Sequence, residues 1–143
     1  MRFMVLIKAN ADTEAGVMPD EQLLAEMTKF NEELVEAGVM EGGEGLHPTS
    51  NGAKVFFDGE RRSDARGPFE NNGQIVCGFW LWKLDSLDEA IAWARRIPNP
   101  TGQKGEVEIR QIFDASDFGE EFTPELRERE EKMRERIAEQ ADA

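Results

Sequence analysis

The chain has 143 residues, enough for one folded domain with a sizeable core, and its formal net charge at pH 7 is −13. A charge of this sign repels phosphate backbones, which argues against nucleic acid as a partner. No apolar run is long enough for a membrane helix, and the first residues do not resemble a secretion signal. The single Cys77 excludes a disulfide within the chain, so a cytoplasmic location is expected.

The first predicted element is a strand from Phe3 to Lys8, followed by a loop over residues 10–17. A helix comes next, with Pro19 expected at its first position and Gly38 at its end. Apolar residues recur along it at every third or fourth position: Leu23, Leu24, Met27, Phe30, Leu34 and Val35. Its opposite side is rich in glutamate, which is typical of a solvated face.

Residues 39–46 predict a second strand in spite of three glycines. These glycines lead into His47 and Pro48 instead of a helix, which excludes a phosphate-binding loop of the nucleotide-binding kind. A hairpin follows, with strands at residues 55–57 and 60–63 and a turn at Asp58-Gly59.

The most apolar run is residues 75–84, and it predicts a central strand. Side chains alternate across a strand, so Phe79 and Leu81 point one way while Trp80 and Trp82 point the other. Both faces are therefore apolar. The chain offers two strong amphipathic helices, expected on one side of the sheet, so we expect a second copy of the sheet to cover the other side and the protein to be a homodimer.

A capping box, Ser86 with Glu89, begins the next helix, which should bury Leu87, Ala90, Ile91 and Ala94. A last strand is expected at residues 106–113. The order β-α-β, hairpin, β-α-β predicts an α+β, ferredoxin-like domain over residues 1–113. Residues 114–143 are expected to form an acidic helical extension that opens at Thr123-Pro124 and carries pairs such as Glu128 with Lys132.

Several segments carry a family resemblance: EAGVMP (14–19), FNEEL (30–34), GEGLHP (43–48), GPF (67–69), GFWLW (78–82), SLDEAIAWARRIPNP (86–100) and DFGEEFTPELRERE (117–130). Together they resemble the YCII-related family in its DGPF-motif branch. The resemblance implies a dimeric α+β barrel, in which the sheets of two subunits face each other. Relatives in the wider barrel group include enzymes acting on small organic acids and ring compounds, as well as binding and regulatory proteins. Genes of the DGPF branch often accompany sigma factors, which implies a regulatory role.

The sequence departs from this branch at its name-giving motif. Arg66 stands where an aspartate usually precedes Gly-Pro-Phe, and Asn71 and Gln74 stand at the acidic positions that usually follow. A role for the motif aspartate therefore does not carry over, and Asp64 could replace it only if the loop is rearranged.

Five residue types provide candidate catalytic or ligand-binding side chains. His47 is the only histidine, the side chain type that titrates near neutrality, and is the candidate general acid or base. Asp64 is a candidate partner in proton transfer, and Glu44 could pair with it. Arg66 and Arg110 are candidate contacts for an anionic ligand, since a guanidinium binds carboxylates with two hydrogen bonds. Trp80 and Trp82 could line an apolar pocket.

Each candidate also has a structural interpretation. His47 could be an exposed loop residue, Arg66 could protect a hairpin edge from pairing, and the two tryptophans and Cys77 could fill the core. One histidine with scattered acids is a weak ligand set, so neither a metal nor another cofactor is predicted.

These patterns leave open whether the chain is an enzyme. The leading hypothesis is a homodimer that binds a small anionic organic molecule between the sheet and the first helix, as a lyase or isomerase working by proton transfer. The alternative is a non-catalytic regulatory or protein-interaction module, linked to sigma-factor regulation, whose acidic faces bind a basic protein partner.

Overall fold

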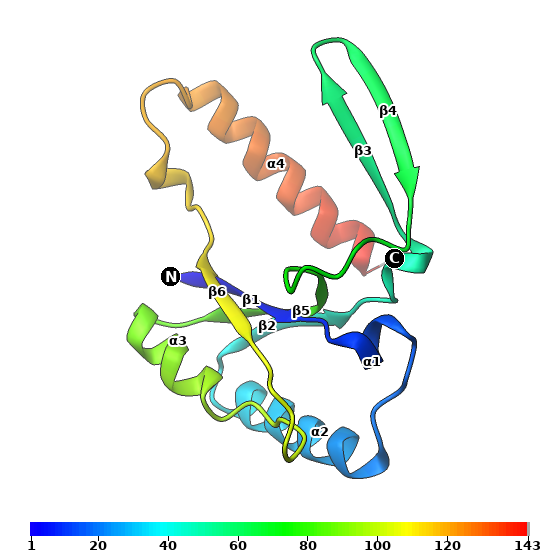
Figure 1. The fold of residues 1–143 in the computed structure, drawn as a ribbon. Helices are drawn as coiled ribbons and strands as arrows, with labels where there is room; N and C mark the ends of the chain where they lie inside the picture. The colour runs from blue at the N-terminus through cyan, green and yellow to red at the C-terminus, as the bar shows by residue number, and fades with distance from the viewer. Residues whose placement is uncertain (143) are drawn as a thin grey trace. The chain divides into compact units, whose positions relative to one another are not determined.

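A computed structural model describes residues 1–142, which form two compact units, Met1–Ile112 and a second unit from Phe113 onward (Figure 1). The elements of the first unit are β1 (Arg2–Lys8), α1 (Ala11–Glu14), α2 (Glu21–Glu36), β2 (Met40–Gly45), the 3-10 turn η1 (Thr49–Asn51), β3 (Ala53–Asp58), β4 (Arg61–Arg66), β5 (Val76–Lys83), α3 (Leu87–Ala94) and β6 (Val107–Gln111). The second unit contains the 3-10 turn η2 (Ala115–Asp117) and α4 (Pro124–Ala141).

The main sheet has four strands in the order β2-β5-β1-β6, and all its neighbours are antiparallel. With α2 and α3 as the two connecting helices, this is a ferredoxin-like α+β fold, as predicted. The β3–β4 pair forms a separate two-stranded hairpin, inserted between the second and third strands of the main sheet. Pairing of this sheet with a second copy stays a prediction.

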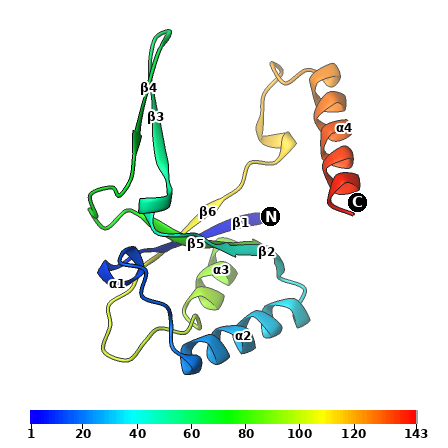
Figure 2. The same ribbon diagram turned by 90° about the vertical axis from the view of Figure 1, so that its right-hand side faces the viewer.

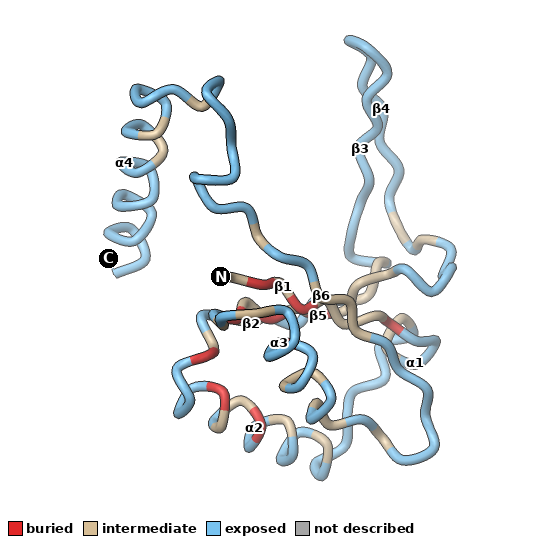
Figure 3. The backbone as a smooth tube through the Cα atoms, turned by 90° about the vertical axis from the view of Figure 1, so that its left-hand side faces the viewer, coloured by how far each residue is buried: buried red, intermediate tan, exposed pale blue. Residues whose placement is uncertain are grey.

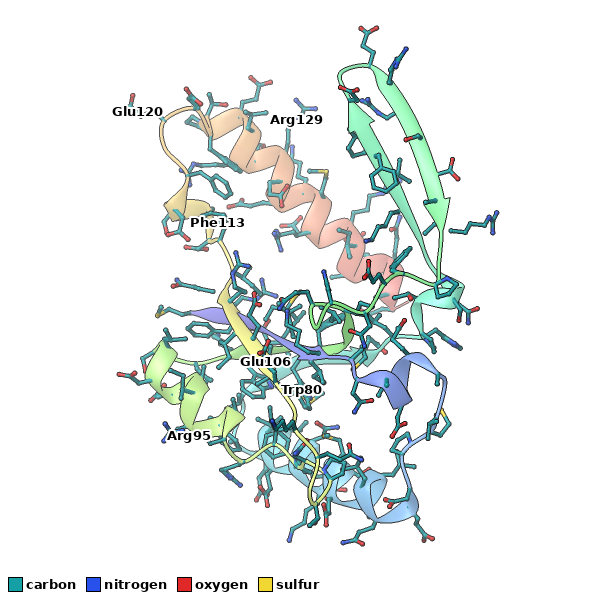
Figure 4. The ribbon with its side chains drawn as sticks, in the orientation of Figure 1. Trp80, Arg95, Glu106, Phe113, Glu120 and Arg129 are labelled. Atoms are coloured by element: carbon teal, nitrogen blue, oxygen red, sulfur yellow. The ribbon has the colours of Figure 1, made fainter. Side chains whose placement is uncertain are left out.

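The core lies on the side of the sheet that carries α2 and α3 (Figures 2 and 3). The strand register places Phe3 opposite Trp82 and Val5 opposite Trp80, so these four side chains share one face. From α2, Phe30 packs its ring edge against Trp80, with centroids 5.9 Å apart. The alternation predicted for residues 75–84 is therefore confirmed: Trp80, labelled in Figure 4, points toward the helices, and Trp82 is buried in the same cluster.

The opposite face of the sheet, called the open face below, carries a second apolar row. Met4, Leu6, Phe79 and Leu81 belong to it, and each is half-buried within the chain. The hairpin rises from this side of the sheet, whereas α2 and α3 both lie on the other (Figure 2). The two helices thus cover only one of the two apolar faces, as the sequence predicts.

Two starts of helices differ from the predictions. Residues 11–14, expected to be part of a loop, form α1, because Asn10 and Thr13 cap each other: the Asn10 side chain accepts from the Thr13 N–H, and Thr13 Oγ1 accepts from the Asn10 N–H. The next helix begins after Pro19 instead of at it. Asp20 is its N-cap and accepts from the Leu23 N–H at 2.8 Å, a position that aspartate favours.

The hairpin turn and α3 also differ in detail. The turn residues are Gly59 and Glu60, because Asp58 pairs with Arg61; Gly59 has a φ of 60°, which suits the first central position of a type II′ turn. The face of α3 that packs on the core is rotated relative to the predicted one. Trp93 packs on the core in place of Leu87 and Ile91, which are exposed.

In the second unit, α4 begins as predicted, with Thr123 as N-cap and Pro124 in the first turn. Lys132 pairs with Glu128 at 3.1 Å. Phe118 lies between Phe113 and Phe122, with ring centroids 5.3 and 5.4 Å apart. No residue of α4 is buried among the residues described, so its stability depends mainly on such pairs and on its cap.

Candidate functional site

Three segments that are far apart in sequence meet at Thr49. The Glu14 carboxylate accepts from the Thr49 N–H at 2.9 Å and from its hydroxyl at 2.5 Å. The same hydroxyl accepts from the Phe69 N–H at 2.9 Å, and the Gly67 N–H donates to the Gly52 carbonyl. Charge-assisted bonds of this kind are stronger than neutral ones, so α1, η1 and the Gly-Pro-Phe segment are held together.

Gly67 lies too close to η1 for any side chain. A Cβ added there would lie 1.7 Å from the Thr49 carbonyl oxygen and 2.6 Å from its carbonyl carbon. Both are backbone atoms, so no rotamer change relieves the overlap. The glycine of the Gly-Pro-Phe segment is therefore required by the close approach of η1.

A pocket of about 500 Å³ opens beside this junction. Its walls come from the segment between β2 and β3 and from the segment that leads into β5. Polar and charged groups among the lining residues are His47, Thr49, Asn51, Lys54, Glu70, Asn72 and Gln74, and apolar ones include Leu46, Phe69 and Ile75. The pocket is wide open, and it combines an apolar wall with several donors, as small-molecule sites do.

His47 is exposed at this pocket, and Asn51 makes a hydrogen bond with one of its ring nitrogens. Asn51 Nδ2 lies 3.1 Å from His47 Nδ1. With the amide assigned as donor, the neutral ring carries its proton on Nε2 and presents that N–H as a donor. The arrangement suits hydrogen bonding to an anionic oxygen, and protonation of the ring would add a positive charge to the same contact.

Lys54 supplies the positive charge of the pocket. Its ammonium lies 4.5 Å from the centroid of the Phe69 ring, over the ring face. Because Phe69 is held by Thr49, the contact positions this cation at the pocket wall. An anion that enters the pocket would meet Lys54 and His47, and the amides of Asn72 and Gln74 offer further donors.

Gln74 connects the pocket to the open face of the sheet. Its side-chain oxygen accepts from Lys8 Nζ at 3.0 Å, and Lys8 also pairs with Glu108 at 3.1 Å. Arg110 lies 3.3 Å from the other oxygen of Glu108. Hydrogen bonds from Lys8 and Arg110 lower the pKa of the Glu108 carboxyl below its ordinary value.

This shift predicts an acid-sensitive contribution to stability. A carboxylate with a lowered pKa in the folded state stabilises the fold above its unfolded pKa, and the contribution is lost as pH falls through the folded pKa. We expect the Glu108→Gln variant to lose less thermal stability than the wild type when the pH is lowered. Melting curves over a pH series would measure it, with Glu106→Gln as the control; equal acid sensitivity in both variants would contradict the assignment.

The structure brings only some of the predicted site residues together. Asp64 and Arg66 lie on β4, exposed and on one face of the hairpin, and neither lines the His47 pocket. Glu44 and Arg110 lie on the open face, on the two opposite edge strands of the main sheet. Within the described residues, His47 is thus the one predicted site residue in this pocket.

Trp80 and Trp82 lie on the other side of the sheet, in the core. Trp80 donates through its ring N–H to Asn31 at 2.9 Å, and Trp82 is fully buried. Among the residues described, the ring N–H of Trp82 has no hydrogen-bond partner. Cys77, half-buried on β5, has its thiol pKa raised by burial, which disfavours the reactive thiolate.

Several residues of the site escaped prediction from sequence: Glu14, Thr49, Lys54 and Asn72. One signal was available, since Glu14, His47 and Gly67–Phe69 all fall within segments that carry the family resemblance. No pattern in the local sequence links these residues, because each segment is expected to be a separate loop.

Two features are absent from residues 1–142. Within that range no cluster of three or more histidine, cysteine, aspartate or glutamate side chains is arranged to hold a metal ion. Over the same described range, no helix combines the length and the apolar character needed to cross a membrane.

Comparison with known proteins gives two results. The sequence model for the YCII-related domain matches residues 1–116. An uncharacterised protein of Rhizobium meliloti (strain 1021) is 29% identical over 93 residues, which cover 65% of this chain and 75% of the relative. The matched range of the domain contains the whole first unit, including the His47 pocket.

Proposed function

Because the chain belongs to the YCII-related domain family, we propose that it is a homodimer that binds a small organic anion in the His47 pocket. The observation that carries the proposal is the meeting of Lys54 and His47 at one pocket in a strongly acidic protein. Most of the surface repels anions, so a site that attracts one needs local positive charge and directed donors. Compared with the expectation from sequence, Lys54 takes the place of Arg66 or Arg110 as the anion contact.

The dimer is proposed on the basis of the open face. Met4, Leu6, Phe79 and Leu81 form its apolar row, and burying a large apolar side chain contributes about 1.5–3 kcal/mol. Facing sheets from two copies would bury both rows and form the dimeric barrel that the family resemblance implies. Lys8, Glu108 and Arg110 would then lie around the apolar row as a polar rim.

The chemistry proposed for the pocket is proton transfer, as in a lyase or an isomerase. His47 is placed to donate to a ligand oxygen through its Nε2–H, while Lys54 stabilises negative charge that develops on the ligand. Asp64 does not line this pocket, so it has no part in the proposed step. We place the chain in the DGPF-motif branch, with Arg66 in place of the motif aspartate.

His47 offers a direct test, because it is the only histidine and its imidazole gives one set of NMR signals. We expect one or more short mono- or dicarboxylic acids to shift these signals saturably. Lys54→Met should weaken that binding by about tenfold, the loss expected for one charge-assisted contact. His47→Ala should keep the dimer and lose any turnover of the ligand.

The matched control is Lys104→Met, which removes an exposed lysine outside the pocket and should leave binding unchanged. If no acid moves the His47 signals, or if both lysine variants weaken binding equally, the pocket is not the anion site. Unchanged turnover in His47→Ala would remove His47 from the mechanism.

A second candidate is a non-catalytic interaction module for a basic protein partner, linked to regulation. One observation favours it: α4 exposes its apolar residues Leu126, Met133 and Ile137 as well as its many acids. An isolated helix with so little burial is marginal, so a partner would stabilise it. The NMR titration separates the two functions, because this module predicts no response of His47 to small acids.

A further inference from the structure

The β3–β4 hairpin, residues 53–66 and here called the arm, stands away from the rest of the first unit. Every one of its residues is exposed, and Figure 3 shows it exposed along its whole length. Val55, Phe56 and Phe57 are among the exposed apolar residues, and Phe57 is 72% exposed. A two-stranded hairpin without further packing is marginally stable in water, so this arm is incomplete as it stands.

The strand register shows what the arm offers on each side. Phe57 pairs with Arg62, and Val55 with Asp64, on one side; Phe56 lies on the other. Arg62 stacks over the Phe57 ring at 4.5 Å and donates to the Gly59 carbonyl, which orders the tip. The arm therefore combines apolar and arginine side chains, a composition enriched in protein interfaces.

The direction and length of the arm suggest its partner. Figures 1 and 2 both show it rising from the open-face side of the sheet, the side on which the proposed second copy lies. Each of its strands has six residues, so the arm extends about 20 Å, and packed sheets lie about 10 Å apart. An arm of this length would pass the partner's sheet and reach the level of its helices.

Charge favours the same partner. The arm has four basic and three acidic side chains, whereas the whole chain has 17 basic and 30 acidic ones. The exposed side of α2 is instead strongly acidic. It has one base, Lys29, and four acids: Glu21, Glu26, Glu32 and Glu36. Opposite charges brought together across an interface stabilise the pairing and select the partner.

We infer that the arms of the two copies are exchanged: each lies against the other copy through the side that carries Phe56 and Arg61, with Phe56 covered and the tip arginine Arg61 near the acidic side of α2. This inference rests on the dimer of the proposed function. It adds that the dimer is held by the arms as well as by the sheets. This mutual contact of each arm with the other copy, called the clasp below, buries arm residues that are exposed in the isolated chain.

Hydrogen exchange tests the clasp in the full-length protein. Backbone amides of residues 53–66 should exchange quickly in dilute, monomeric protein and at least about tenfold more slowly in the dimer, since docking closes the hairpin to solvent. Sedimentation at the same concentrations identifies the species. A dimer whose arm amides exchange as fast as in the monomer would overturn the clasp and leave the dimer standing, whereas a chain that remains monomeric would overturn both.

A charge reversal tests the contact itself. Arg61→Glu should weaken the dimer by about tenfold, and rising salt should reduce the difference from the wild type. Arg129→Glu on α4, labelled in Figure 4, makes the same change in net charge outside the arm and is the matched control. If both variants weaken the dimer equally, or if neither weakens it, the tip makes no specific contact with the partner.

Discussion

Gly67→Ala is expected to destabilise the first unit by about 3 kcal/mol, at the upper end of the usual cost of overpacking. The new methyl group would overlap the Thr49 carbonyl, which cannot move aside because the Glu14 carboxylate and the Phe69 N–H both hold Thr49. For a domain of this size such a loss lowers the melting temperature by about 10 °C. Thermal unfolding followed by circular dichroism would measure it.

The matched control is Gly45→Ala, because a Cβ at Gly45 would meet no atom within 4 Å. That variant should change the free energy of unfolding by less than about 1 kcal/mol. The two variants add the same methyl group, so their difference isolates the close approach of η1. Similar melting temperatures would mean that the Gly-Pro-Phe segment can move away from Thr49 at little cost.

Leu34→Ala is the second change with a large expected effect. Leu34 is fully buried beneath the sheet, in the cluster that contains Val5, Phe30 and Trp82. Removing a buried leucine side chain leaves a cavity as well as losing apolar burial, which together cost about 2–5 kcal/mol. Urea unfolding should show a lower midpoint with an unchanged slope, because the surface exposed on unfolding stays the same.

The neighbouring Val35 provides the comparison. It is also apolar and on the same helix, yet it is 63% exposed. Val35→Ala should stay within about 0.5 kcal/mol of the wild type. A large loss in this variant would indicate that Val35 is covered in solution, for example by a partner, since the single chain leaves it mostly exposed.

The ferredoxin-like fold could be predicted because its signals are local and strong. The ten-residue apolar run fixed the central strand, and the alternation of Phe79, Trp80 and Leu81 fixed which side chains share a face. The error in α3 shows the limit of such patterns. Leu87 and Ile91 lie on a plausible stripe, but the bulk of Trp93 finds its contacts with Phe30, 6.2 Å away, and sets the rotation of the helix.

The site was less predictable because it is assembled from segments with no common period. His47 could be singled out as the one histidine, whereas the position of Lys54 at the pocket depends on its contact with Phe69, a residue that a hydrogen bond to Thr49 holds in place. Arg66 could be singled out as a candidate anion contact, yet it is not among the residues that line the pocket, although it pairs with the lining residue Ala53 at the base of the hairpin. Contacts between distant loops are tertiary properties, which single-sequence patterns do not contain.

The tryptophan cluster determines what optical spectroscopy can observe in this protein. The chain has three tryptophans and no tyrosine, and Trp80, Trp82 and Trp93 all surround Phe30. Intrinsic fluorescence and near-ultraviolet dichroism therefore report on this one aromatic nucleus. Fraying of α4 or release of the hairpin would pass without an emission change, so those events need a label introduced outside the nucleus.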